Sequence, residues 1–243
     1  MEKFSDAYVV GDGRVALQCE QILNDHFDNV KLIKVDELNN KDDFFNAIKG
    51  ALIISANNLY IFKPPCVKNN FIINYHNSLL PAHRGVNAHV WAIFCGDEIA
   101  GITWHRVDCG IDTGEILIQK EIKINQMSAC DLLLAQHKMA VLAFDELIKN
   151  RLKKIKNASS FNARSELHKK SDLPNNAELN LSWNFDKKQR FLRAFNVGVF
   201  RQIPYAKVKY KGKMLEIIYY EIDNKSINLT LKNGEILRLK EQK

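Results

Sequence analysis

Alternation of short apolar runs with helical segments in the first 76 residues is the feature that most constrains the fold. Runs rich in Val, Ile and Leu predict strands at 7–10, 30–35, 51–55 and 71–75. Amphipathic segments predict helices at 14–23 and 42–48. Strands and helices alternating at this spacing are typical of a mainly parallel sheet covered by helices. We therefore expect an α/β chain with a Rossmann-like core.

The end of the fourth predicted strand carries the first candidate functional residues. Asn74 and His76 lie two residues apart, so their side chains project to one face of the strand. Downstream, Asp112 lies in a loop bracketed by Gly110 and Gly114. Acyl transfer to an amine needs a hydrogen-bond donor for the oxyanion, a group that carries the proton, and a partner that orients the proton carrier. An amide, an imidazole and a carboxylate can supply these three roles. We also expect the carboxylate to raise the pKa of the imidazole. Taken alone, these residue types suit ordinary turns equally well.

The rest of the chain predicts a second, smaller unit. Helices are expected at 87–94 and 128–150, with strands at 99–107 and 115–124. A polar stretch at 158–178 predicts a boundary loop, which gives domains at 1–178 and 179–243. Beyond it we expect a helix at 186–195 and strands at 205–210, 215–222, 227–231 and 236–239. The C-terminal unit is therefore predicted to be β-rich.

Composition narrows the class of protein. The opening residues lack the pattern of a signal peptide and the chain lacks a membrane-length apolar run, so we expect a cytoplasmic protein with no membrane partner. Five scattered cysteines, none in a Cys-x-x-Cys pair, predict mostly small buried residues and no disulfide framework. The histidines lack metal-ligand spacing, so we expect no metal. A net charge of +7 suits anionic ligands as well as nucleic acid, and no nucleic-acid signature is present, so nucleic acid is not an expected partner.

Spaced motifs across residues 70–125 resemble those of the folate-dependent formyltransferases. They are Asn74-x-His76-x-Ser78-Leu79-Leu80-Pro81, Arg84-Gly85, Gly101-x-Thr103-x-His105 and Asp112-x-Gly114. The resemblance implies a formyltransferase core in which Asn74, His76 and Asp112 are catalytic. It also implies N10-formyltetrahydrofolate as co-substrate, without a metal. The folate would lie in a cleft lined by Ile54 to Leu59 and by the residues taken as cofactor-binding, namely Leu79, Leu80, Pro81, Val107, Asp108, Gly110 and Ile111.

Within that family, the chain looks most like bacterial nucleotide-sugar N-formyltransferases. The motif His76-Asn77-Ser78, with Arg193-Ala194-Phe195 and Pro204-Tyr205-Ala206, carries this likeness. It implies a nucleotide-sugar substrate, and dTDP-4-amino-4,6-dideoxyglucose is the first candidate. The 3-amino isomer of this sugar and GDP-perosamine are the alternatives. The product would serve the synthesis of surface polysaccharide such as lipopolysaccharide O-antigen. Sugar contacts are expected at Asn77, His83 and Asn87.

Two other functions stay open at this point. One is an enzyme like methionyl-tRNA formyltransferase, acting on a tRNA-linked amine, although about 60 C-terminal residues are few for the barrel domain those enzymes carry. The other is a folate- or nucleotide-sugar-binding module without catalysis. The resemblance also allows a homodimer through the C-terminal unit.

Overall fold

The computed structural model describes residue 4 and residues 6–155, 165–198 and 203–241. Two compact units are present. The first comprises residues 1–85, 101–122 and 135–167, and the second comprises residues 86–100, 123–134 and 168–243. Each unit thus draws on several stretches of the chain. The predicted domain boundary between residues 178 and 179 remains a prediction.

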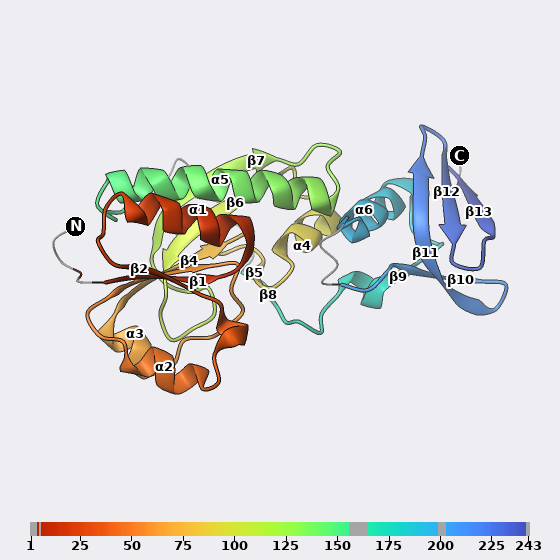
Figure 1. Cartoon of the computed structure of the whole chain (residues 1–243). Helices are drawn as coiled ribbons and strands as arrows, with labels where there is room; N and C mark the ends of the chain where they lie inside the picture. Colours follow the sequence, from red (N-terminus) through yellow and green to blue (C-terminus); the bar gives the residue numbers. More distant parts are fainter. Residues whose placement is uncertain (1–3, 5, 156–164, 199–202, 242–243) are drawn as a thin grey trace. The chain divides into compact units, whose positions relative to one another are not determined.

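A six-stranded sheet forms the centre of the first unit, as the alternating pattern predicted (Figure 1). Its order is β2-β1-β3-β4-β6-β7, with bounds β1 Ala7–Gly11, β2 Val30–Ile33, β3 Leu52–Ala56, β4 Phe71–His76, β6 Ile99–Arg106 and β7 Ile116–Lys123. Strands β1 to β4 pair in parallel, and β6 runs antiparallel to β4. Every residue of β3 is buried, as befits a central strand covered on both faces.

Helices cover both faces of this sheet (Figure 1). Helices α1 (Gly13–Asn24) and α5 (Ala129–Lys149) lie on one face, and α2 (Lys41–Ala47) and α3 (Pro64–Asn69) lie on the other. Trp104 and Phe144, both fully buried, fill the core beneath α1 and α5. Phe45 fills the core on the opposite face. Burying a side chain of this size contributes about 1.5–3 kcal/mol, so the two layers fix the sheet that carries the site.

Helix α5 begins as its sequence predicted. Ser128 Oγ accepts a hydrogen bond from the Asp131 backbone N–H at 3.2 Å, and Asp131 Oδ2 accepts from the Ser128 backbone N–H at 3.0 Å. This reciprocal pair satisfies two N–H groups that the first turn of a helix leaves without partners. Of the described helices, none is long and apolar enough to cross a membrane.

The second unit contains a five-stranded sheet of order β13-β12-β11-β10-β9. Its elements are β9 Glu178–Leu179, α6 Phe185–Phe195, β10 Lys207–Tyr210, β11 Lys213–Ile222, β12 Ser226–Leu231 and β13 Ile236–Lys240. The β-rich C-terminal unit is therefore confirmed. Helix α4 (Ala88–Cys95) belongs to the same unit and packs against α6, where Phe94 contacts Phe191 and Trp183.

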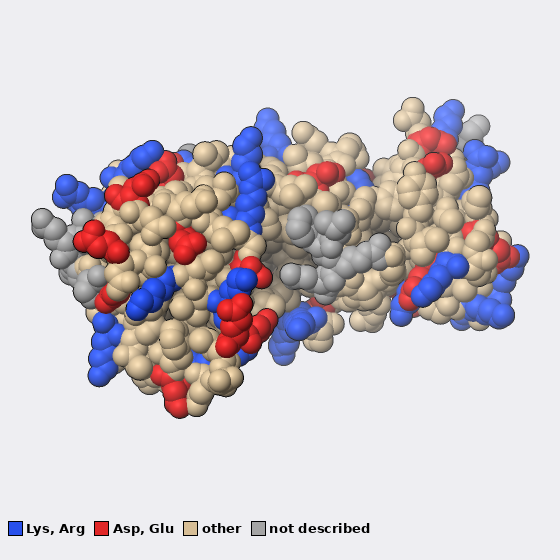
Figure 2. Space-filling model, in the orientation of Figure 1, with Lys and Arg blue, Asp and Glu red and all other residues tan. Residues whose placement is uncertain are grey.

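Charges of both signs are mixed on the face shown in Figure 2. At the turns that connect strands of the C-terminal sheet, Lys211 pairs with Glu235 at 2.5 Å, and Lys232 pairs with Glu216 of β11 at 2.8 Å. A net charge of +7 therefore does not appear on that face as one continuous basic patch.

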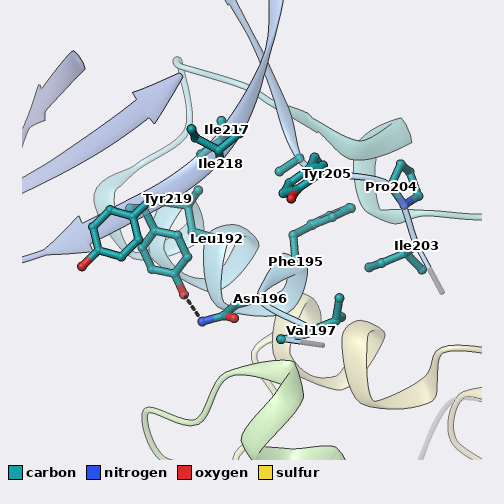
Figure 3. Close-up of a pocket in the computed structure, with 13 residues that line it drawn as sticks. Leu192, Phe195, Asn196, Val197, Ile203, Pro204, Tyr205, Ile217, Ile218 and Tyr219 are labelled. Carbon is teal, nitrogen blue, oxygen red and sulfur yellow. Dashed lines mark hydrogen bonds between the residues drawn. The ribbon is translucent and has the colours of Figure 1, made fainter. Parts of the chain in front are cut away.

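A cavity opens between the end of α6 and β11 in the second unit (Figure 3). Leu192, Phe195 and Ile217 contribute apolar walls. On the polar side of the cavity, the Asn196 side chain donates a hydrogen bond to the Tyr220 hydroxyl at 3.3 Å. Its lining combines apolar surface with a few polar groups, which is the usual composition of a small-molecule cavity.

Several short elements escaped sequence analysis. They are α3, the 3₁₀ turns Val35–Glu37 and Pro174–Ala177, β9, and the two-residue strands β5 (Arg84–Gly85) and β8 (Leu167–His168). A Pro-Pro pair opens α3 and reads as a loop in sequence, although proline suits the first turn of a helix. The cysteine prediction was wrong in part, because Cys95 and Cys109 are exposed and Cys130 is half-buried. All five cysteines are free.

Candidate active site

Strand β4 places Asn74 and His76 on one face of the sheet. In the antiparallel β4–β6 ladder, Asn74 pairs with His105 and His76 pairs with Thr103. Directly opposite residues of two strands share a face. The strand pairing therefore brings a second imidazole beside the predicted amide, a group that sequence analysis did not assign to the site.

The loop between β6 and β7 delivers Asp112 to the same place. Asp108 Oδ1 accepts hydrogen bonds from the Gly110 N–H at 2.9 Å and the Thr113 hydroxyl at 2.7 Å, which folds the loop tightly. A Cβ on Gly114 would lie 1.9 Å from the Arg106 carbonyl oxygen, so only glycine fits where the loop closes. Asp112 itself has a φ of 52°, a left-handed conformation that Asp tolerates better than most residues.

Four donors or ring nitrogens surround the Asp112 carboxylate. Oδ2 accepts from the Gly85 N–H at 2.8 Å and lies 3.5 Å from His76 Nδ1. Oδ1 lies 3.4 Å from His105 Nε2 and 3.5 Å from Asn74 Nδ2. The Asp112 side chain is 11% exposed, against 5% for His76 and 3% for His105. The structure thus brings Asn74, His76 and Asp112 together in a largely water-excluded position.

The hydrogen bonds of His76 define its tautomer. Nε2 lies 2.9 Å from the His83 carbonyl oxygen, which can only accept, so Nε2 carries the proton. In the neutral ring Nδ1 is then an unprotonated nitrogen, and it is the atom that faces Asp112. The neutral imidazole can therefore take up a proton at Nδ1.

Burial governs the ionisation of His76. Burial lowers the pKa of its imidazole, and although Asp112 and the His83 carbonyl raise it, the net pKa lies below 6.5. The expected effect of the carboxylate is confirmed, because Asp112 raises the pKa of His76, but desolvation by burial outweighs it. For Asp112, burial raises the pKa, but the two neighbouring imidazoles and the hydrogen bond from the Gly85 N–H outweigh burial and hold the pKa of the carboxyl below its ordinary 3.8. At neutral pH the pair is an ionised carboxylate facing a neutral imidazole.

A buried polar network holds the loop that follows His76. Gln136 Nε2 donates to the Asn77 carbonyl at 2.7 Å and to the Gly101 carbonyl at 2.9 Å. Gln119 Nε2 donates to the Leu80 carbonyl at 2.9 Å, and the Leu80 N–H donates to Thr103 Oγ1 at 3.1 Å. Side chains from β6, β7 and α5 therefore fix the backbone whose His83 carbonyl orients His76.

The residues predicted to bind folate fall into two groups. The side chains of Leu79 and Leu80 are 5% and 4% exposed, so they offer backbone groups more readily than side chains. Ile111 is 43% exposed on the Asp112 loop, and Asp108 has its carboxylate engaged within that loop. Val107 donates its N–H to the Ile72 carbonyl at 2.9 Å. Pro81 and Gly110 lie in the same two loops as the others.

The loop after β3 adds exposed apolar surface. Leu59 is 69% exposed and Ile61 is 62% exposed. Ile54, at the start of the stretch expected to line the cleft, is fully buried in the core and cannot line an open cleft.

Of the residues predicted to contact sugar, Asn77 and His83 lie in the loop after His76. His83 is largely buried and has a φ of 48°. Asn87 has a φ of 58° and stands at the N-cap of α4, in the second unit.

Five residues that contact or support the site were not predicted as site residues from the sequence, namely His105, Thr103, Gly85, Gln119 and Gln136. Thr103 and His105 follow Gly101 at alternate positions of a predicted strand. Alternate residues of a strand share a face, and this is the one signal that could have placed the two side chains on the face of the site. The glutamines act through long-range contacts of 39 and 59 residues' separation, which no local pattern encodes.

Comparison with known proteins finds a family match over the central part of the chain. Residues 34–142 match the family described as Formyl transferase. GDP-perosamine N-formyltransferase of Brucella melitensis is 33% identical over 150 residues, covering 61% of this chain and 54% of the relative. Methionyl-tRNA formyltransferase of Caldicellulosiruptor saccharolyticus is 29% identical over 230 residues, covering 88% of this chain and 68% of the relative. The chain thus spans about half the length of the first of these relatives.

A solved structure agrees over nearly the whole chain. The N-formyltransferase from Helicobacter canadensis, in complex with folinic acid and dTDP-3-aminofucose, aligns with a TM-score of 0.68 at 18% identity. The alignment covers 98% of this chain and 100% of that one. This likeness establishes the fold. The stretch that resembles the Formyl transferase family, residues 34–142, includes Asn74, His76, His105 and Asp112.

Proposed function

We propose that the protein transfers a formyl group from N10-formyltetrahydrofolate to the amine of a nucleotide-linked amino sugar. The observation that carries this proposal is the convergence of Asn74, His76 and Asp112 at the end of β4. The Formyl transferase match, and a structural neighbour in complex with folinic acid and a dTDP-amino sugar, support it.

In the proposed reaction, the neutral amine attacks the formyl carbon and an oxyanion develops. One N–H of the Asn74 amide stabilises that oxyanion, and the low exposure of the site strengthens the interaction. The amine loses a proton to Asp112 or to His76 Nδ1, which lie 3.5 Å apart and face one another as two bases. The protonated Nδ1–H can then donate to the oxyanion. As the intermediate collapses, the proton passes to N10 of the leaving folate, and none of these steps requires a metal.

The folate is proposed to lie across the loops 79–81 and 107–111. Buried Leu79 and Leu80 present backbone groups, and exposed Ile111, with the neighbouring Leu59 and Ile61, offers apolar surface to a flat ring. The sugar is proposed to contact Asn77, His83 and Asn87.

The sugar itself is proposed as dTDP-4-amino-4,6-dideoxyglucose. GDP-perosamine is the second candidate, because a GDP-perosamine N-formyltransferase is among the relatives. Both carry an amine on a deoxysugar attached to a nucleoside diphosphate, so the same catalytic groups serve either. A net charge of +7 suits an anionic nucleotide in both cases.

A tRNA-linked amine is a second candidate substrate, because a methionyl-tRNA formyltransferase aligns with 88% of the chain. RNA binding depends on basic side chains that neutralise many phosphates. At the turns of the C-terminal sheet, Lys211 and Lys232 are instead paired with Glu235 and Glu216. These pairs favour the nucleotide sugar.

Mass spectrometry tests the proposal directly. The protein is incubated with N10-formyltetrahydrofolate and, in separate reactions, with dTDP- and GDP-linked amino sugars and with methionyl-tRNA. The expected result is a mass gain of one CO on an amino sugar and none on methionyl-tRNA. Formylation of methionyl-tRNA alone would replace the proposed substrate, and binding of both ligands without any transfer would make the protein a binding module.

A further inference from the structure

The buried imidazole of His105 has its two nitrogens in different roles. Nδ1 lies 2.7 Å from the Arg106 carbonyl oxygen. A carbonyl oxygen only accepts, so Nδ1 carries a proton. In the neutral ring Nε2 is therefore an acceptor. It lies 3.2 Å from Asn74 Nδ2, across the β4–β6 ladder.

An acceptor at that position decides which way the Asn74 amide faces. Only the amide nitrogen of Asn74 can donate to His105 Nε2, and one of its N–H groups does so. The same nitrogen is therefore the amide atom that lies beside Asp112. The second N–H points toward Asp112 Oδ1 over a long 3.5 Å. That weak contact leaves this N–H available to a stronger acceptor.

We propose that His105 is a positioning residue that orients the Asn74 amide, so that its second N–H meets the oxyanion of the transferred formyl group. This inference rests on the proposed function and deepens it. If the His105 acceptor is removed, the amide can turn over and present its oxygen, which would repel the oxyanion. The carbonyl of Arg106 fixes His105, His105 fixes Asn74, and Asn74 faces the reacting atoms.

The competing arrangement makes His105 an imidazolium that donates from Nε2 to Asp112. It would leave Asn74 with its oxygen toward His105, in place of the amide nitrogen that lies there. The Asn74 contact at 3.2 Å is shorter than the Asp112 contact at 3.4 Å, which favours the neutral ring.

Nitrogen NMR of the histidine-labelled protein tests the tautomer without any substrate. The expected spectrum shows His105 with a protonated Nδ1 and an unprotonated Nε2 at neutral pH, assigned by the loss of its signals in His105→Gln. A His105 ring protonated on both nitrogens would overturn the proposal. This result is independent of whether the enzyme acts on sugars.

Kinetics of variants test the coupling to Asn74. His105→Leu is expected to lower kcat on the order of 100-fold with KM within a few-fold, the effect of a misplaced catalytic group. His105→Gln, whose amide oxygen can accept at the same place, is expected to recover most of that loss. His26→Leu, which removes an exposed histidine that follows α1 in the same unit, is the control and is expected to keep wild-type kcat.

A double-mutant cycle separates positioning from general damage. In a protein that already carries Asn74→Ala, His105→Leu is expected to lower kcat by less than about threefold, because the effects of residues that act as a unit are not additive. The proposal would be overturned if the kcat of the double variant fell by the product of the two single losses. It would also be overturned if His105→Gln failed to recover activity. A wild-type protein that formylates no tested amine would instead refute the proposed function, and the NMR result would still decide the tautomer of His105.

Discussion

His76 Nδ1 faces Asp112 Oδ2 at 3.5 Å while His76 Nε2 donates to the His83 carbonyl at 2.9 Å. Two acceptors thus face one another across a short gap, and the gap is where a proton from the attacking amine would be received. Burial keeps the imidazole neutral, since it lowers the pKa of His76 below 6.5 despite the adjacent carboxylate. A neutral base and an ionised carboxylate at neutral pH are what the proposed reaction requires of the resting site.

The pKa of His76 can be measured by NMR titration. We expect its midpoint below that of an unfolded histidine, about 6.5. Asp112→Asn removes a charge that raises the pKa of His76, so the midpoint should move still lower in that variant. A midpoint above the unfolded value, or an upward move in Asp112→Asn, would show that burial does not dominate the site.

Replacement of Asn74 by alanine should lower turnover on the order of 100-fold or more, because loss of one preorganised oxyanion donor typically costs 10²–10³. Steady-state kinetics with the formyl donor and amino sugar measures it. Asn150→Ala, at an exposed position beyond α5, is the control and should retain full activity. If Asn74→Ala kept more than about half of wild-type turnover, its catalytic assignment would fail.

Gly114 should not tolerate a side chain. Gly114→Ala places a Cβ 1.9 Å from the Arg106 carbonyl oxygen, so the Asp112 loop must move. We expect a loss of about 1–3 kcal/mol in the free energy of unfolding, typical of overpacking, together with reduced turnover. Gly50→Ala is the contrast, since Gly50 has a φ of 69° and nothing within 4 Å of its Cβ. It should lose about 1–2 kcal/mol from backbone strain and retain kcat. Equal kcat values for the two variants would contradict the role given to the loop.

Gln136 should matter to both stability and rate. Gln136→Leu leaves the carbonyls of Asn77 and Gly101 without their donor, and each unsatisfied buried group costs about 1–3 kcal/mol. Urea unfolding measures the loss, and kinetics should show a lower kcat because the loop that orients His76 is freed. Gln126→Leu, at an exposed loop position, should change neither quantity. Unchanged stability in Gln136→Leu would mean that this network does not hold the loop.

Local patterns predicted the elements that carry the site, and long-range packing supplied what they missed. The period of two that placed Asn74 and His76 on one face also holds for Thr103 and His105, but nothing local says that β6 pairs beside β4 with Asn74 opposite His105. The net direction of the His76 pKa shift depends on packing for a similar reason. A neighbouring carboxylate can be inferred from sequence motifs, whereas the depth of burial that outweighs it depends on the complete fold.

Asp112→Asn tests the central claim most directly. The substitution keeps the shape of the side chain and one acceptor oxygen but removes the charge and the base. Calorimetry should show folate and nucleotide sugar binding within a few-fold of wild type, while turnover at saturation collapses, which is the signature of an interaction made in the transition state. If Asp112→Asn instead loses substrate binding but turns over normally at saturation, Asp112 is a binding residue and the proton-transfer mechanism is wrong.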